Sequence, residues 1–459
     1  MSSDNTSVSR LTQLAASILD SVSRLEATLS MQACPLPSFD PDAPTLLPKD
    51  AIGIRDSIID CAAEIQDLLL GPFDMLYMQA SVNSSVSLQA ISRFKIAELV
   101  PLGGRTTFAS IAQEIGLGER TVRRLLRHAT TMRVFHEPEP GVLVHTKASK
   151  LLRDPVANAW LLCGTEEMWP ASVKMVEALE KWTESQEPNH TGFALSNSTG
   201  ESIYEVLKQN PQRAARFGNN MKAFMEMQEF NSTHVVNNYD WKSLGGPFLF
   251  LCNMQFETLV YSPSRRLTKC HCSSRPVLLI LSVAGQVRIV DVGGGPGHIS
   301  LELAKHFPHL SFIVQDLEIF SPDLPDEVGD RIKYMKHDMF APQTIHAEVY
   351  FFRWILHNWS DKYCHLILKR LIPMLTPGTK ILINEICMPE PRTISHWRER
   401  YLRSFDLLMG AGFASHERNL DEWKALFTEA DPRFKFSMVN ESNESALAIM
   451  EFVWTDLTG

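Results

Sequence analysis

The sequence predicts an α/β protein in which a mostly parallel sheet, covered by helices on both faces, follows a largely helical amino-terminal half. Three observations carry this prediction. The chain has 459 residues, enough for several domains. From residue 287 onward, patterns of buried strands alternate with patterns of amphipathic helices. Before residue 247 helical periodicity dominates, and one short strand pattern at 141–146 interrupts it.

Composition and charge exclude several classes of protein. Hydrophobic residues make up 44% of the chain and charged residues 21%, a mixture typical of globular domains. The net charge is −9, whereas nucleic-acid-binding proteins are usually basic, so we expect no nucleic-acid partner. The longest apolar run, 277–285, is far shorter than the ~20 residues of a membrane span. The amino terminus lacks a secretory-signal pattern. We therefore expect a cytoplasmic protein with reduced cysteines and no membrane contact.

Residues 1–80 are predicted to form dimerisation helices. Between residues 8 and 30, apolar side chains recur every three or four positions and so share one face of a helix. A proline-rich link at 35–48 separates this helix from a second helical region at 50–79. Stripes this apolar must be buried. We favour burial against a partner subunit over packing on the chain's own body.

Residues 81–155 are typical of a winged-helix unit. Helix patterns at 92–100, 106–117 and 119–135 precede the strand pattern at 141–146, and a short helix at 147–152 closes the unit. The third helix is rich in arginine, so DNA binding is an alternative. Small winged units also serve as dimer scaffolds, and we favour that role here.

Residues 156–246 are predicted to be a helical region with two interpretations. Its helices carry aromatic and methionine-rich faces, which are more often core than ligand pocket. Methionine nevertheless adapts to irregular apolar ligands, so a substrate-pocket wall is the second interpretation. The side chains concerned are Trp160, Met168, Trp169, Phe217, Phe224, Met225 and Met227.

The most informative motif is a glycine loop, Asp291-Val-Gly293-Gly294-Gly295-Pro296-Gly297. It directly follows a predicted strand and opens a predicted helix, where glycines permit a tight turn and close approach of a ligand. Dinucleotide-binding enzymes have similar loops, so the glycines alone are ambiguous. Asp291 favours S-adenosylmethionine, because a carboxylate there can face a cationic ligand but would repel a pyrophosphate.

Two further strand ends support the same cofactor. Asp316 ends the second predicted strand, where it can accept hydrogen bonds from both ribose hydroxyls. Asp338 and Met339 follow the third strand; the carboxylate can accept from the adenine amine, and the thioether can pack on the purine. Carboxyl ends of parallel strands meet at one edge of a sheet, so we expect one crevice. The structural alternative is that the glycines serve turn geometry alone.

With these motifs the chain resembles the plant and fungal O-methyltransferases typified by caffeic-acid and flavonoid methyltransferases. More narrowly, it is similar to fungal sterigmatocystin-type enzymes of secondary metabolism. The resemblance implies a Rossmann-like S-adenosylmethionine-dependent methyltransferase fold with a winged-helix dimerisation domain. It also implies a homodimer that methylates a hydroxyl of an aromatic, polyketide-type metabolite. The matching segments are Asp291–Gly297, Asp316, HDMF at 337–340, RWILHNWSD at 353–361, ILINE at 381–385 and Glu417-Arg418.

His357 is the candidate general base. It follows the fourth predicted strand, and an imidazole can take a phenolic proton because its pKa lies near neutral. The resemblance implies that Glu385 and Glu417 flank this imidazole, hold its tautomer and stabilise the imidazolium. It also places Arg353 beside the cofactor, where plant relatives often carry lysine. No metal-ligand spacing recurs, so we expect no metal.

Other functions fit parts of the sequence. One is a winged-helix DNA-binding regulator with a degenerate methyltransferase domain, and the intact glycine loop speaks against it. Another is the same fold with non-methylating chemistry such as decarboxylation, and His357 with its two carboxylates speaks against that. A third is a catalytically inactive dimer partner.

Residues 247–285 interrupt the resemblance before the methyltransferase domain, predicted at 286–459. This segment holds three of the eight cysteines, four Lys or Arg and one acidic residue, and it has no clear helical or alternating period. We interpret it as a retained intron in the gene model, a hypothesis that the transcript can test. The alternatives are a functional lid, a tolerated surface insertion or a zinc clip through Cys252, Cys270, His271 and Cys272.

Overall fold

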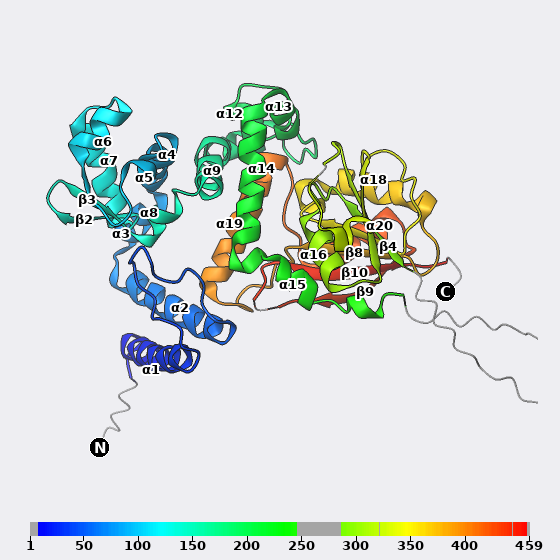
Figure 1. Ribbon diagram of the computed structural model, residues 1–459, viewed down its shortest axis with the longest axis horizontal. Coiled ribbons are helices and arrows are strands. Elements are labelled where there is room, and N and C mark those ends of the chain that lie inside the picture. The colour runs from blue at the N-terminus through cyan, green and yellow to red at the C-terminus, as the bar shows by residue number, and fades with distance from the viewer. Residues whose placement is uncertain (1–7, 246–285, 321, 443, 457–459) are drawn as a thin grey trace, which may run out of the picture.

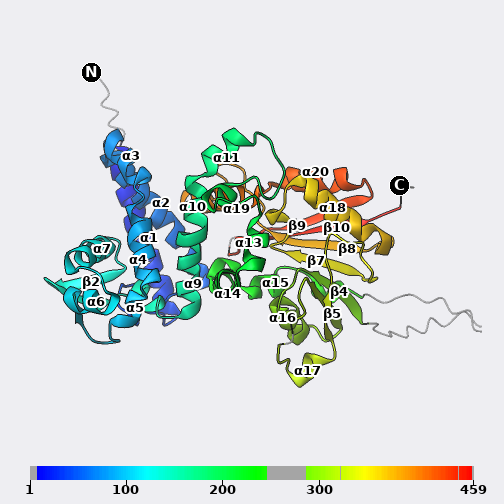
Figure 2. The same cartoon turned by 90° about the horizontal axis from the view of Figure 1, so that it is seen from above.

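The computed structural model describes residues 8–245, 286–320, 322–442 and 444–456. The predictions made for the segment 247–285 lie outside these ranges and are not tested. Within the described residues, helical layers lie at one end of the molecule and a large sheet at the other, with α14 (Pro211–Glu226) and α19 (His396–Phe413) between them (Figures 1 and 2). No helix described here combines the length and apolarity needed to cross a lipid bilayer.

A seven-stranded sheet forms the carboxyl-terminal half, as the sequence predicts. Its strand order is β6-β5-β4-β7-β8-β10-β9, and the first five strands run parallel. The predicted terminal hairpin supplies the last two, which are antiparallel. The strands are β4 (Val287–Val292), β5 (Leu310–Asp316), β6 (Ile332–Lys336), β7 (Val349–Arg353), β8 (Lys380–Glu385), β9 (Phe434–Asn440) and β10 (Ala448–Trp454).

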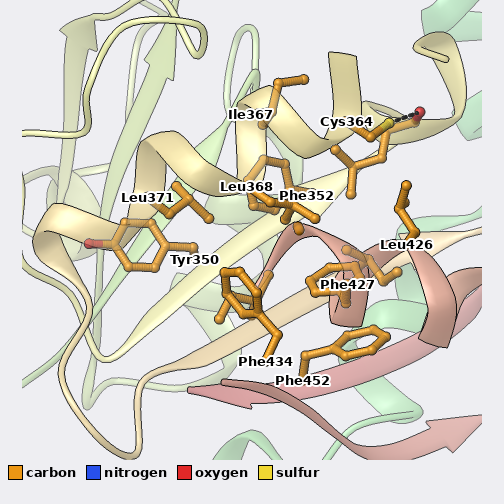
Figure 3. Packing of buried hydrophobic residues seen from close by; sticks show 14 of the residues in the cluster. Tyr350, Phe352, Cys364, Ile367, Leu368, Leu371, Leu426, Phe427, Phe434 and Phe452 are labelled. Atoms are coloured by element: carbon orange, nitrogen blue, oxygen red, sulfur yellow. Dashed lines mark hydrogen bonds between the residues drawn. The ribbon is translucent and has the colours of Figure 1, made fainter. Parts of the chain in front are cut away.

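Alternating residues of the sheet feed two apolar cores. Phe352 in β7 belongs to a cluster under α18 and α20, where Phe427 stacks on Phe452 with ring centroids 3.6 Å apart (Figure 3). Its neighbour Phe351 belongs to the opposite cluster, under α15 and α16. This alternation is what a sheet buried on both faces requires. The helices are α16 (His298–His306), α17 (Asp326–Gly329), α18 (Asp361–Leu371) and α20 (Leu420–Ala430), with short turns η5 (Leu356–Asn358) and η6 (Ile372–Met374).

The amino-terminal helices are α1 (Arg10–Met31), α2 (Ile52–Leu69) and α3 (Pro72–Ala80), with a short turn η1 (Lys49–Ala51) before α2. The predicted single region at 50–79 is therefore two helices, because Gly71-Pro72 ends one and begins the next. Helices α1 and α2 pack on each other. Large apolar side chains stay exposed on α2 and α3, namely Ile59, Leu68, Leu69, Phe73, Leu76, Tyr77 and Met78. These side chains lie in the region 50–79, which the sequence analysis expects to contact a partner subunit.

A helical unit with a three-stranded sheet of order β1-β3-β2 follows. The helix predicted at 92–100 begins earlier, at Asn83, and is interrupted at Lys95, whose φ is +50°. Strand β2 was missed because it crosses Pro138, where the pairing register shifts. The elements are α4 (Asn83–Arg93), α5 (Ile96–Leu99), β1 (Thr106–Thr107), α6 (Phe108–Ile115), α7 (Glu119–Thr131), β2 (Phe135–Glu139), β3 (Val142–His145) and α8 (Lys147–Leu151).

The region at 156–245 is helical, as predicted. Its aromatic and methionine side chains are half-buried: Phe217 packs near α19, whereas Phe224 packs beside the end of the sheet. The remaining elements are α9 (Pro155–Cys163), the π-helical turn η2 (Gly164–Met168), α10 (Trp169–Val173), α11 (Met175–Lys181), α12 (Gly192–Ser196), α13 (Ile203–Gln209), η3 (Gln228–Phe230), α15 (Ser232–Asn237) and η4 (Trp241–Ser243).

Candidate active site

The predicted site residues gather at the carboxyl edge of the parallel strands. Asp291 lies near the end of β4, Asp316 ends β5, Arg353 ends β7 and Glu385 ends β8. Strand β4 lies between β5 and β7, so the strand order reverses beside it. A crevice at such a reversal is where open α/β sheets bind ligands.

The glycine loop has a shape that needs its glycines. Gly293 and Gly297 have φ angles of +71° and +76°, a region that side chains rarely adopt. A Cβ atom on Gly293 would lie 2.5 Å from the Ile355 side chain, and one on Gly297 would lie 2.9 Å from the Tyr334 hydroxyl. The glycines are therefore needed for the conformation of the turn. Because glycine has no side chain, they also leave the backbone of the loop accessible to a ligand.

Two acidic side chains hold this loop. Asp291 is buried directly beneath Gly294 and accepts a hydrogen bond of 2.6 Å from the Ser300 hydroxyl; burial raises the pKa of Asp291 to about 6. Asp316 accepts from the backbone N–H groups of Gly295 (3.0 Å) and Leu317 (2.7 Å). Burial also raises the pKa of Asp316. The carboxylate of Asp316 thus reaches the loop across the crevice, next to the place where a ribose is expected.

The other candidate cofactor residues surround the same crevice. Asp338 is exposed and accepts from the Phe340 N–H at 3.0 Å, and Met339 is half-buried against the core. Arg353 donates to the side chain of Asn384 and to the backbone carbonyl of Phe230. Burial lowers the pKa of Arg353 to about 10, and it stays a cation at neutral pH. Exposed carboxylate, open loop backbone and apolar thioether together fit an adenosine group with a charged amino-acid tail.

His357 lies on the turn η5 and is paired with Glu417. The Nδ1 atom of His357 is 2.8 Å from Oε1 of Glu417, and both side chains are buried. An ionised carboxylate can only accept, so Nδ1 carries the proton and Nε2 has a free lone pair. Burial alone would lower the pKa of His357, but the negative charges of Glu417 and Glu385 raise it above its usual value. The imidazole is therefore tuned to accept a proton.

Glu385 acts on the backbone next to the histidine. Its Oε1 atom accepts from the N–H groups of Ile355 and Leu356, each at 2.9 Å, and burial raises its pKa. Trp354, at the start of this turn, has a left-handed φ of +54°, a strained conformation that such contacts must hold. The structure thus brings Glu417 to the imidazole ring and Glu385 to the peptide groups that precede it.

Arg418 is a site residue to which the sequence analysis gave no role. It is fully buried, donates to the carbonyl of Trp359 at 2.9 Å and pairs with Asp361 at 2.7 Å. Its guanidinium lies 5.1 Å from the Trp423 ring centroid. The sequence signal for a site role was the position of this arginine directly after the candidate carboxylate Glu417. A charged residue in a buried segment needs several partners, so Arg418 could be expected to bind groups of the site.

Aromatic side chains form a wall beside the histidine turn. Trp354 lies 5.2 Å from Phe230 and 5.6 Å from Phe224, centroid to centroid, and Phe405 lies 5.7 Å from Phe230. Tyr401 extends the wall along α19. These rings come from the consecutive elements α14 and η3, from α19 and from the turn after β7, so three separate parts of the chain build one aromatic cluster, in which Phe230 is fully buried.

Comparison with known proteins identifies the family. Residues 75–154 match the O-methyltransferase dimerisation domain, and residues 263–432 match the O-methyltransferase domain. O-methyltransferase PaMT of Phomopsis amygdali is 35% identical over 97% of both chains. Chlorophenol O-methyltransferase of Trichoderma longibrachiatum is 32% identical over 98% of this chain and 91% of its own. The solved structure of LepI in complex with SAM matches with a TM-score of 0.67 at 19% identity, over 95% of this chain and 100% of that one.

The chain therefore belongs to the O-methyltransferase family. The family and the fold predicted from the motifs are confirmed. The protein is an O-methyltransferase whose methyl donor is S-adenosylmethionine, and it carries the dimerisation domain of its family.

Proposed function

We propose that the protein methylates a phenolic hydroxyl of an aromatic secondary metabolite, with His357 as general base. The observation that carries this proposal is the pairing of buried His357 with Glu417, which leaves Nε2 without a hydrogen-bond partner among the described residues. This atom belongs to a residue of η5, the turn that follows Trp354 of the aromatic wall. A base and an aromatic surface at one strand end suit a phenolic acceptor.

The route of the phenolic proton follows from the acid–base chemistry of the site. A phenol has a pKa near 10, so it is mostly protonated at neutral pH. His357 takes the proton on Nε2 as the phenolic oxygen becomes a nucleophile, and the charge of the resulting imidazolium is stabilised by Glu417. Glu385 adds a second negative charge and fixes the backbone of the turn. S-adenosylmethionine, when bound, supplies an electrophilic methyl group on a sulfonium.

The cofactor residues predicted from the sequence are proposed to hold that donor. Gly293 and Gly295 give the donor's amino-acid end access to backbone, while Asp291 and Arg353 set the charge around it. For the nucleoside, Asp316 is assigned the ribose hydroxyls, Asp338 the adenine amine and Met339 the purine face. Asp316 ends β5 and Asp338 follows the adjacent strand β6, which supports their action on one nucleoside.

The acceptor class draws support from the aromatic wall and from the relatives. The rings of Phe224 and Phe230 pack edge to face on Trp354, and the half-buried Phe224 and Trp354 are the ones proposed to contact a flat aromatic ligand. One relative is named for chlorophenol, a simple phenol, and another for a grayanic acid biosynthesis cluster of Cladonia grayi. We therefore place this enzyme in fungal-type secondary metabolism.

A homodimer is the proposed assembly. Support comes from the dimerisation domain at 75–154 and from the exposed apolar side chains of α2 and α3. Burying such a surface against a second copy would remove a large apolar area from water. We propose the same division of the chain as before. Residues 1–80 form dimerisation helices, 81–155 a winged-helix-like dimerisation domain, 156–246 a helical region and 286–459 the methyltransferase domain.

The experiment is to compare His357→Gln with the wild-type enzyme on phenolic acceptors. We expect kcat to fall by about 10²–10⁴ because proton removal is lost, with cofactor affinity in calorimetry unchanged within about twofold. His136→Gln is the control, since this histidine is exposed and makes no side-chain hydrogen bond in the described structure. Mass spectrometry must show a product heavier by one methylene. Near-normal turnover of His357→Gln would move the base elsewhere.

A further inference from the structure

The chain between α19 and α20 wraps around the turn that carries His357. Helix α19 ends at Phe413, and its C-cap residue Ala414 has a left-handed φ of +52° that turns the chain toward that turn. The segment 414–418 then contacts the turn at several points: Ser415 reaches its backbone, Glu417 its imidazole and Arg418 its carbonyls. The proposed function uses only Glu417 of this segment.

The Ser415 hydroxyl has two carbonyl oxygens within reach but one proton to donate. Its Oγ atom is 2.6 Å from the carbonyl oxygen of His357 and 2.9 Å from that of Trp359. The Trp359 carbonyl also accepts a hydrogen bond from Arg418 Nη2 at 2.9 Å. The His357 carbonyl receives no other hydrogen bond from the described residues. The shorter distance and the otherwise unpaired acceptor assign the proton to His357.

One short segment therefore holds both the peptide group and the ring of His357. Ser415 holds the peptide group of His357, and Glu417, two residues later, holds its ring. The segment is itself anchored, because the N–H of Glu417 donates to Oδ1 of Asp406 on α19 at 2.8 Å. Ser415 is buried, so no solvent competes for its hydrogen bond.

We propose that Ser415 is a positioning residue for the methyl-transfer reaction: its hydroxyl fixes the peptide of His357 and thereby aims Nε2 at the acceptor hydroxyl. This inference rests on the proposed role of His357 as base. It is separate from that role, because Ser415 touches neither the imidazole nor the proton that moves.

Loss of the hydroxyl should act on alignment and on the pKa of the base. Without Ser415 the buried carbonyl of His357 is unpaired, and the peptide can regain a partner only by rotating. Rotation carries the ring with it and weakens its bond to Glu417. The charged groups facing the ring are Glu417 and Arg418 on this segment, with Asp361 paired to Arg418, and Glu385 from β8. Weaker contact with Glu417 lowers the pKa of His357.

The test is Ser415→Ala in the full-length enzyme, with phenolic acceptor and cofactor. We expect kcat to fall at least tenfold with KM and cofactor affinity unchanged within twofold, and the acidic limb of the kcat profile to move to lower pH. Ser404→Ala is the matched control, because the Ser404 hydroxyl also donates to a carbonyl, that of Arg400, but on the exposed face of α19. If the alanine variant does not fold, Ser415→Cys keeps the volume with a weak donor and carries the same expectations.

A double-variant comparison separates this inference from the proposed function. In a His357→Gln background, Ser415→Ala should cause no further loss of kcat, since it acts only through the histidine. Unchanged kcat in Ser415→Ala, a loss fully additive with His357→Gln, or cofactor affinity falling as far as kcat would each overturn the positioning role. Near-normal turnover of His357→Gln alone would instead refute the base, whatever Ser415→Ala does.

Discussion

Helix α19 is capped by a carboxylate from far away in the chain. Ser395 occupies its N-cap position, but the serine hydroxyl makes no capping bond. Asp60 of α2 takes that place and accepts from the N–H groups of His396 (2.8 Å) and Trp397 (2.9 Å). One turn earlier on α2, Asp56 pairs with Arg398 at 2.5 Å. Asp60→Ala should therefore loosen the first turn of α19.

The magnitude follows from the two lost acceptors. Removing a capping side chain costs about 0.5–2 kcal/mol, and loss of negative charge at a helix N-terminus adds roughly 0.3–1 kcal/mol. We expect about 1–2 kcal/mol in local stability, so the amides of residues 396–399 should exchange with deuterium roughly 5–30-fold faster. Hydrogen-exchange mass spectrometry of the peptide covering the start of α19 measures this directly. A global unfolding midpoint is a poorer measure in a chain with several domains.

Asp67→Ala is the matched control for this experiment. Asp67 lies on the same helix, is exposed and makes no hydrogen bond or ion pair in the described structure, so its replacement changes the charge of α2 without touching α19. Faster exchange in both variants would indicate a general effect of charge. Unchanged exchange at 396–399 in Asp60→Ala would refute the capping role, because water would then be as good a partner as the carboxylate.

Two further predictions concern cofactor binding and acid stability. Asp316→Ala should weaken S-adenosylmethionine binding by about 2–4 kcal/mol in calorimetry, because it removes the ribose acceptor and the support of Gly295; unchanged affinity would contradict the assignment. Burial alone would raise the pKa of Glu451, but bonds from Lys380 and Tyr239 hold it below its usual value. Its contribution to stability is therefore present above the unfolded pKa, about 4.3, and is lost as pH falls through the folded pKa. Urea midpoints should fall less steeply with acid in Glu451→Gln than in wild type.

The sheet could be predicted because its signals are local. Each buried strand is a short apolar run bounded by polar or turn residues, as in VRIVDV at 287–292 and TKILINE at 379–385. Parallel strands then place their carboxyl ends on one edge, so Asp316, Arg353 and Glu385 come together without any knowledge of side-chain contacts. The capping of α20 by Asn419 is local in the same way.

The features that were missed depend on contacts from distant residues. Ser360 sits at the N-cap of α18, a residue type that commonly caps helices, yet its hydroxyl donates to the carbonyl of Gln186 instead. Glu385 was expected to flank the imidazole, and its charge does act on His357, but its hydrogen bonds to backbone N–H groups 29 and 30 residues away were not predicted. In both cases the local sequence allows several hydrogen-bond partners for the side chain. Contacts with distant parts of the chain determine which bond forms.

Helix α19 links the amino-terminal helices to His357, the proposed general base. Asp60, which precedes the matched dimerisation domain, caps its first turn; Asp406, near its middle, holds the N–H of Glu417; and Ala414, at its end, turns the chain toward Ser415. A shift of α19 along its axis would therefore move both contacts that hold His357. Because close-packed helices move as units, the contact of α2 with α19 constrains the position of His357, although these elements are far apart in the sequence. Dimerisation on the α2 and α3 surface would act on catalysis through this helix.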